Sequence, residues 1–330
     1  MSASRTEHAA PATAVVATSI SVAYPSVAGP TPPDVVLARV DAAGYQGVQL
    51  RSVRELDATL DRGALRELGA IAADLGLRLE AGIGCAGPDG DTDAVVAELG
   101  AQIEAGAEAG ITEFFVYTRV TRPERPAQLD VIAERLRALA PVAAGDGAYV
   151  NLKTHEDLSS VDVLTTVERV DHPSLGVGLD VANLVVRGED PVTAAARLAP
   201  HLRQTHLEDI ALFFVADGLR RRLRPCGAGV LDWTALLGVL DTAPAAPRLT
   251  LEQHRGLFDV PLFDPHWFDH EPQVGARDVA ALVHLARQTE ERVARGQIPP
   301  LAELPGPADE ASAWAELQTS ADHLRRVAAA

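Results

Sequence analysis

Residues 151–157 read Asn-Leu-Lys-Thr-His-Glu-Asp and follow a short apolar run, Ala148-Tyr149-Val150, that is typical of a buried strand. The stretch places a lysine, a histidine and two acidic residues within five positions. Such charges are costly at the end of an apolar strand unless they are paired or bound to something. Because alternate residues of a strand face the same side, Lys153 and His155 are expected on one face, with Glu156 where the strand gives way to a loop.

Three later strand-like runs also end in polar residues: 176–183 with Asp180, 202–209 with His206 and Asp209, and 248–254 with Glu252 and His254. Strands and helices alternate as eight pairs between about residues 14 and 295, which predicts parallel pairing through right-handed crossovers. Eight such units favour a closed (β/α)₈ TIM barrel, with an open doubly wound sheet as the alternative. The first strand is not followed by Gly-x-Gly-x-x-Gly, which weakens a dinucleotide-binding interpretation.

Three segments are predicted along the chain. Residues 1–12 form a flexible leader, residues 13–295 the barrel, and residues 296–330 a C-terminal extension that packs on the barrel or on a partner subunit. The extension follows a Pro-rich break and ends in a helix over residues 310–327. Residues 275–287 are expected to form the first part of the eighth barrel helix. Residues 257–272 form a long connection rich in Phe, Pro, Asp and Trp, a composition typical of a lid or a partner surface.

The composition of the chain disfavours several classes of protein. Two cysteines, Cys85 and Cys226, are too few for a disulfide framework and favour a reduced, cytoplasmic setting. No apolar run approaches the roughly 18–20 residues of a membrane span. The net charge of −17 disfavours a nucleic-acid partner. The one basic run, residues 220–224, is interpreted as a solvated or carboxylate-paired loop.

The C-terminal ends of all strands of a barrel meet on one face, and four metal-ligand residue types close strands five to eight: Glu156, Asp180, His206 and Glu252. Each alone would more often be a helix cap or a salt-bridge partner. Together they predict one divalent metal ion, Mn²⁺ first, with Mg²⁺, Co²⁺ or Zn²⁺ as alternatives.

Several stretches resemble the xylose isomerase-like barrel superfamily, the sugar-phosphate isomerase/epimerase group that also contains the family-2 abasic-site endonucleases. They are Gly-Leu-Asp-Val-Ala-Asn at 178–183, Arg-Gly-Glu-Asp-Pro at 187–191, His-Leu-Glu-Asp at 206–209, Gly-Ala-Gly-Val-Leu-Asp-Trp at 227–233 and Leu-Glu-Gln-His at 251–254. The resemblance implies one divalent metal held by carboxylates on strands five, six and eight and by the histidine of strand seven. Those roles would fall on Asp180, His206 and Glu252.

The chain departs from the family pattern at two strands. Strand five of many relatives ends in Glu-Asn-His, and here Lys153 stands at the Glu position, so that Glu156 or His155 must complete the metal shell. Strand seven often reads His-Leu-Lys-Asp, and here Glu208 replaces the Lys, so that a basic substrate contact is lost or is supplied by Lys153. Residues 256–267 also resemble a loop in barrel subunits of bacterial C-glycoside deglycosidases, which pair with a small β-rich subunit.

A divalent metal bound to a sugar carbonyl and its neighbouring hydroxyl would stabilise an enediolate. The base would be His155, or Lys153 if burial lowers its pKa. A salt bridge from Lys153 to Glu156 or Asp180 explains that lysine equally well. His254 would act in acid–base chemistry or support the metal ligands. Further predicted substrate contacts are Arg51, Glu80, Asn183, Asp209, Phe258 and Trp267; the aromatic pair could equally line a subunit interface.

The sequence therefore predicts a metal-dependent enzyme that removes a proton next to a carbonyl of a sugar, keto-sugar or glycoside. The result would be isomerisation, epimerisation or elimination, as in C-glycoside cleavage after oxidation. A non-catalytic binding barrel and a metal phosphodiesterase of the abasic-site endonuclease type are the alternatives. A homo-oligomer or a pairing with a β-rich subunit is expected.

Overall fold

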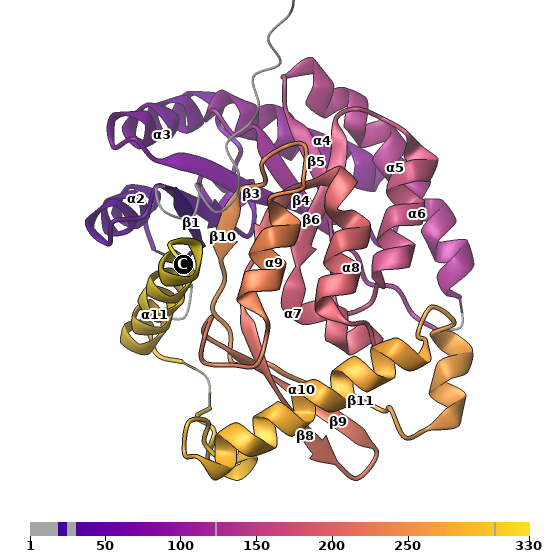
Figure 1. The fold of residues 1–330 in the computed structure, drawn as a ribbon. Helices are drawn as coiled ribbons and strands as arrows, with labels where there is room; N and C mark the ends of the chain where they lie inside the picture. Colours follow the sequence, from indigo (N-terminus) through magenta and orange to yellow (C-terminus); the bar gives the residue numbers. More distant parts are fainter. Residues whose placement is uncertain (1–18, 25–30, 123, 307) are drawn as a thin grey trace, which may run out of the picture.

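A closed barrel forms the centre of the protein in a computed structural model that describes residues 19–24, 31–122, 124–306 and 308–330 (Figure 1). Its strands are β1 (Ile20–Ala23), β2 (Gly47–Leu50), β3 (Arg78–Cys85), β4 (Glu113–Tyr117), β5 (Tyr149–Lys153), β6 (Leu175–Asp180), β7 (Leu202–His206) and β10 (Leu249–Leu251), all parallel. Parallel bridges from Gln204 to Arg248 and from Leu207 to Leu251 join β7 to β10 and close the ring. The barrel prediction is confirmed; the predicted leader lies outside the described residues.

The helices α2 (Pro33–Ala42), α3 (Arg62–Asp74), α4 (Thr92–Glu108), α5 (Arg125–Gly145), α6 (Ser160–Val170), α8 (Pro191–Leu198) and α9 (Trp233–Leu240) follow successive strands. Short helical turns are α7 (Val181–Leu184), η1 (Val53–Glu55), η2 (Val185–Arg187), η3 (Ala199–His201), η4 (Pro265–His270) and η5 (Leu301–Glu303). Local sequence fixes several of the helix starts. Ser159 caps α6 in a capping box with Asp162, and Pro191 opens α8 after the Asp190 cap.

The ring of outer helices is completed by the C-terminal helix. Helix α11 (Glu310–Ala328) packs against α9 and β10, and its Trp314 ring lies 5.9 Å from that of Tyr24, which follows β1. Helix α10 (Ala276–Ala294), predicted as the eighth barrel helix, packs instead against an added sheet below the barrel in Figure 1. The reason is that the chain leaves the barrel after β10 and returns to it only at α11.

The added sheet is antiparallel and has three strands, β8 (Asp209–Val215), β9 (Gly218–Arg224) and β11 (Leu257–Val260). Strand β9 contains the basic run 220–224, so the prediction of a loop there is wrong. Its residues alternate between the two faces: Leu219, Arg221 and Leu223 are buried, while the arginines between them are more exposed. The sheet carries polar side chains of β9 to the C-terminal rim of the barrel. Within the described residues, no helix is long and apolar enough to cross a membrane.

Candidate functional site

A cavity of about 920 Å³ opens where the C-terminal ends of the barrel strands meet the added sheet. We call it the barrel cavity. Six of the residues predicted for catalysis or metal binding line it: Lys153, His155, Glu156, Asp180, Glu252 and His254. Arg51 and Asn183 also line it, together with Tyr117, Arg119, Glu208, Arg221 and Arg255. The cavity thus lies on the face where barrel enzymes carry their sites.

Lys153 ends β5, and its ammonium lies at the centre of three strand ends. The Nζ atom donates to Glu252 Oε2 at 3.0 Å and lies 3.1 Å from Asp180 Oδ2 and 3.1 Å from His206 Nδ1. Lys153, Asp180 and His206 are all buried. Burial disfavours the ammonium, yet the charges of Glu252 and Asp180 outweigh it and raise the pKa of Lys153 above its ordinary value. Burial raises the pKa of Glu252, but the charge of the same ammonium, and after it that of His254, outweighs burial and holds the pKa of that carboxyl well below its usual range.

The predicted ligand set for a metal ion is not assembled. Asp180, His206 and Glu252 do converge, but they surround Nζ of Lys153. Glu156 turns elsewhere: its Oε2 lies 3.0 Å from His155 Nε2 and its Oε1 lies 3.7 Å from an Arg221 nitrogen. The residues present therefore do not fit a divalent ion at the position that the sequence predicts.

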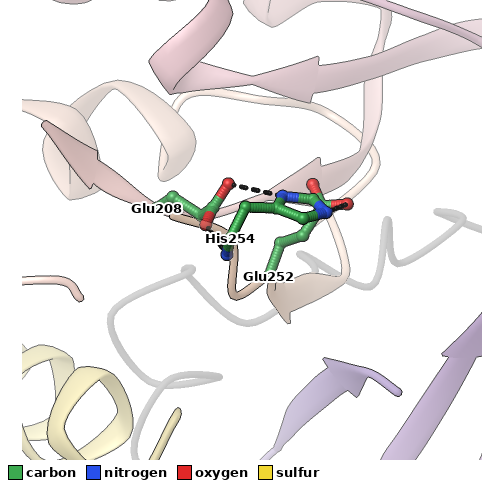
Figure 2. A group of neighbouring side chains, drawn as sticks. All are labelled: Glu208, Glu252 and His254. Carbon is green, nitrogen blue, oxygen red and sulfur yellow. Dashed lines mark hydrogen bonds and ion pairs between the residues drawn. The ribbon is translucent and has the colours of Figure 1, made fainter. Parts of the chain in front are cut away.

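A second group of ionisable side chains lies beside the first, formed by Glu208, Glu252 and His254 (Figure 2). His254 Nδ1 lies 3.1 Å from Glu208 Oε2, and its Nε2 lies 3.6 Å from Glu252 Oε1. One ligand atom from each residue lies within 4.8 Å of the others, so the group could hold a metal ion. The Glu208 charge raises the pKa of His254 to about 10, so the imidazole would first have to lose a proton. Burial raises the pKa of Glu208, although His254 opposes that change.

His155 lies between two carboxylates. Its Nδ1 is 2.9 Å from Asp157 Oδ1 and its Nε2 is 3.0 Å from Glu156 Oε2. Burial lowers the pKa of His155, but these two hydrogen bonds outweigh it and raise that pKa to about 9. Burial raises the pKa of Glu156, and His155 reverses the effect and lowers it to about 2. His155 and Lys153 are therefore both cations near neutral pH, and neither fits the predicted role of base.

Asn183 and Arg221 form one wall of the barrel cavity. Arg221 of β9 is buried and donates to Asn183 Oδ1 at 2.7 Å, and its guanidinium carbon lies 6.0 Å from the centre of the Phe258 ring. Phe258 is partly exposed, next to the cavity-lining Leu257. Arg51 pairs with Glu55, and both line the cavity. These placements leave Arg51, Asn183 and Phe258 available as substrate contacts.

Glu80 is buried inside the barrel and does not line the cavity. Its Oε2 accepts hydrogen bonds from Gln204 at 2.6 Å and from Thr250 at 3.2 Å. The Glu80 side chain therefore pairs polar groups within the barrel, and its substrate contact stays a prediction.

Asp209 and Trp267 also make structural contacts, and their substrate contacts stay predictions. The Asp209 carboxylate accepts four N–H groups, from the backbone of Ile210, Gly227 and Leu231 and from Trp233 Nε1, at 2.8–3.0 Å. It holds the start of β8 to the loop before α9. Trp267 is buried edge-on to Phe268, with ring centres 5.1 Å apart, and packs so closely on Gly188 that an added Cβ there would lie 2.6 Å from the indole.

Sequence reasoning missed Glu208 and Arg221 as functional candidates. In the sequence, Glu208 stands out only as a replacement for a basic residue, because its pairing with His254 depends on two segments that follow different strands. Arg221 had a signal in the sequence: Asp217-Gly218 separates two runs of strand-like residues, which is typical of a hairpin.

The family follows from comparison with known proteins. The model of the xylose isomerase-like TIM barrel family matches residues 37–282, about three quarters of the chain. The chain belongs to this family. The Escherichia coli K12 protein YihM is 28% identical over 129 residues, which is 38% of this chain and 40% of YihM. A 3-oxo-isoapionate decarboxylase of Pectobacterium atrosepticum is 27% identical over 42% of this chain and 56% of that protein. A 3-dehydroshikimate dehydratase of Bacillus anthracis is 26% identical over 31% of this chain and 42% of that protein. The matches thus span about half of these relatives.

Several solved structures share the fold of this chain at low sequence identity. A D-psicose 3-epimerase of Clostridium cellulolyticum H10, solved with D-tagatose, has a TM-score of 0.60 and 14% identity, over 82% of this chain and 99% of its own. The 3-keto-D-glucoside 4-epimerase of E. coli has a TM-score of 0.56 and 17% identity, over 80% and 98%. A barrel protein of Mycobacterium smegmatis, solved in complex with magnesium, has a TM-score of 0.58 and 17% identity, over 84% and 100%.

Proposed function

We propose that this family member is an enzyme that transfers a proton at the carbon next to a carbonyl group of a sugar, keto-sugar or glycoside. The observation that carries the proposal is the Glu208–His254 pair, whose 3.1 Å contact lies in the wall of the barrel cavity. The pair combines a carboxyl of raised pKa with an imidazolium, and groups whose pKa values are shifted by each other and by burial are typical of acid–base catalysis. The names of three relatives describe 3-oxo, 3-dehydro and 3-keto compounds, which agrees with chemistry beside a carbonyl.

Roles follow from charge. Glu208 would accept the proton from carbon, and His254, held on the same carboxylate, would donate a proton to the carbonyl oxygen. Near neutral pH, the Lys153 ammonium and the His155 imidazolium supply positive charge to the cavity, which favours a developing enediolate. Isomerisation and epimerisation return the proton to carbon, and elimination expels the group β to the carbonyl.

A divalent ion such as Mn²⁺ that entered the cavity would be held by Glu208, Glu252 and His254, because these three can converge on one point. It would polarise a carbonyl oxygen. The proposed proton transfer uses the side chains alone.

The test is deuterium exchange. The protein is incubated in D₂O with a panel of ketoses and 3-keto-glucosides, and NMR follows deuterium entering the carbon next to the carbonyl. We expect exchange with at least one compound, reduced about 10²-fold or more in Glu208→Gln and in His254→Asn, as is typical of a lost acid–base group. His266→Asn is the matched control, because His266 is 90% exposed and pairs with Asp269 outside the cavity.

Equal exchange in His254→Asn and in the wild type would refute the assignment. A specific observation favours a second function, a barrel that binds a sugar without converting it: the three N–H groups of Lys153 are already engaged by Asp180, Glu252 and His206. Saturable sugar binding by calorimetry, with no exchange for any compound, would establish that function.

A further inference from the structure

Lys153 is the only lysine among the 330 residues; every other basic residue in the count of 29 Lys and Arg is arginine. A chain that uses arginine at all its other basic positions keeps one lysine at the mouth of its barrel. The two side chains differ in shape: the ammonium is a compact charge with three N–H groups, and the guanidinium is a planar fork. The single lysine therefore places a compact cation at this position, where every other basic residue of the chain would place a planar guanidinium.

The surroundings of Lys153 fit such a cation. Its neighbours are Asp180 Oδ2 and His206 Nδ1, both at 3.1 Å, and Glu252 Oε2 at 3.0 Å. These acceptors come from the ends of β6 and β7 and from the residue after β10, so they approach Nζ from three different strands. The centre of the Phe115 ring lies 5.9 Å from Nζ. The ammonium is thus held by oxygen and nitrogen atoms of the types that bind divalent metals.

A metal ion and this ammonium cannot share the site. A divalent ion bound to the same three atoms would lie about 2.0–2.6 Å from each of them. It would then lie in the space of Nζ, and two cations in van der Waals contact repel each other strongly in a buried site. Lys153 must move out or be replaced before a metal can bind there.

We propose that the Lys153 ammonium takes the place of a divalent metal ion among Asp180, His206 and Glu252. The site then carries a permanent cation that is part of the chain, with one positive charge instead of two. Chelators cannot remove it. The inference concerns which cation occupies this position and is tested by metal binding, so its failure would leave the proposed proton transfer standing.

The test converts the site back. Isothermal titration calorimetry measures Mn²⁺ binding to the wild type, Lys153→Glu and Lys153→Met. Circular dichroism first verifies that each protein is folded. We expect Lys153→Glu to bind one equivalent of Mn²⁺ more than the wild type and to show a raised thermal unfolding midpoint in Mn²⁺. Lys153→Met, which frees three ligand atoms but adds none, should bind the same equivalent more weakly. Adding Asp180→Asn to either variant should abolish the gain.

Two results would overturn the inference. The first is a wild-type protein that already binds Mn²⁺ in a manner lost in Asp180→Asn. The second is a folded Lys153→Met that gains no Mn²⁺ over the wild type, which keeps the test decisive if Lys153→Glu does not fold without metal. The wild type could also bind Mn²⁺ at the neighbouring group of Glu208, Glu252 and His254. Such binding would be lost in Glu208→Gln and retained in Asp180→Asn. The inference is then decided by whether the lysine variants bind more Mn²⁺ than the wild type.

Discussion

Removing the Lys153 charge should destabilise the protein in a pH-dependent way. Lys153→Met keeps the length of the side chain but removes the cation that Asp180 and Glu252 share. Asp180 is 4% exposed, and Glu252 is partly buried. Breaking a buried ion pair by removing one partner costs about 3–5 kcal/mol. Because one ammonium serves two carboxylates here, we expect a loss of that size in the free energy of unfolding at pH 8.

The pH dependence follows from the lowered pKa of Glu252. A carboxyl whose pKa is lower in the folded state adds stability above its unfolded pKa, about 4.3, and that stability is lost as pH falls through the folded value. In Lys153→Met, burial still disfavours the Glu252 carboxylate and the ammonium no longer offsets that effect, so Glu252 takes up a proton more readily. The gap between wild type and variant should therefore be largest above about pH 6 and should narrow towards pH 4.

Urea unfolding, followed by circular dichroism at pH 8 and pH 4.5, measures both effects. Adding Glu252→Gln to Lys153→Met removes one of the two uncompensated charges and should recover part of the loss, which a purely steric effect would not show. An unchanged urea midpoint at pH 8, or a gap of equal size at both pH values, would refute the reasoning.

Glu271 is buried and pairs with Arg122, Arg125 and Arg187. Glu271→Ala should lower the free energy of unfolding, measured in urea, by about 3–5 kcal/mol; a change below about 1 kcal/mol would contradict this. Asp209→Ala leaves four N–H groups without their acceptor, and should lower the thermal midpoint without weakening sugar binding by calorimetry. The pKa of His254 is raised to about 10 by Glu208, so its contribution to stability is full below about pH 6.5 and is lost as pH rises through 10; His254→Asn should flatten the alkaline fall in thermal midpoint, and an unaltered pH profile would exclude the pairing.

The architecture of the barrel could be predicted because its signals are local. Alternating apolar strands and helices, each helix opened by residues such as Ser159 or Pro191, require only near neighbours in sequence. The convergence of Asp180, His206 and Glu252 also followed, since the ends of adjacent parallel strands meet on one rim. These three side chains need no loop to position them: Asp180 and His206 end their strands, and Glu252 directly follows β10.

The details that decide the chemistry depended on contacts distant in sequence. The sequence predicts Glu156 in the metal shell. Arg221, however, lies 65 positions later on a hairpin where the sequence predicts a loop, and together with His155 it draws Glu156 aside. With Glu156 turned away, Lys153 fills the centre of the cluster. The choice between a base, a salt bridge and a substitute cation for Lys153 therefore required the positions of three other strands.

The last helix of the ring has a consequence for how the protein is made on the ribosome. The barrel strands are all present once Leu251 has emerged, but the place beside α9 and β10 that α11 fills stays open until Ala328 is synthesised. At about 5–20 residues per second, that interval lasts several seconds. Throughout it, the apolar surface that later covers Leu317 and Leu324 is exposed to chaperones and to neighbouring nascent chains.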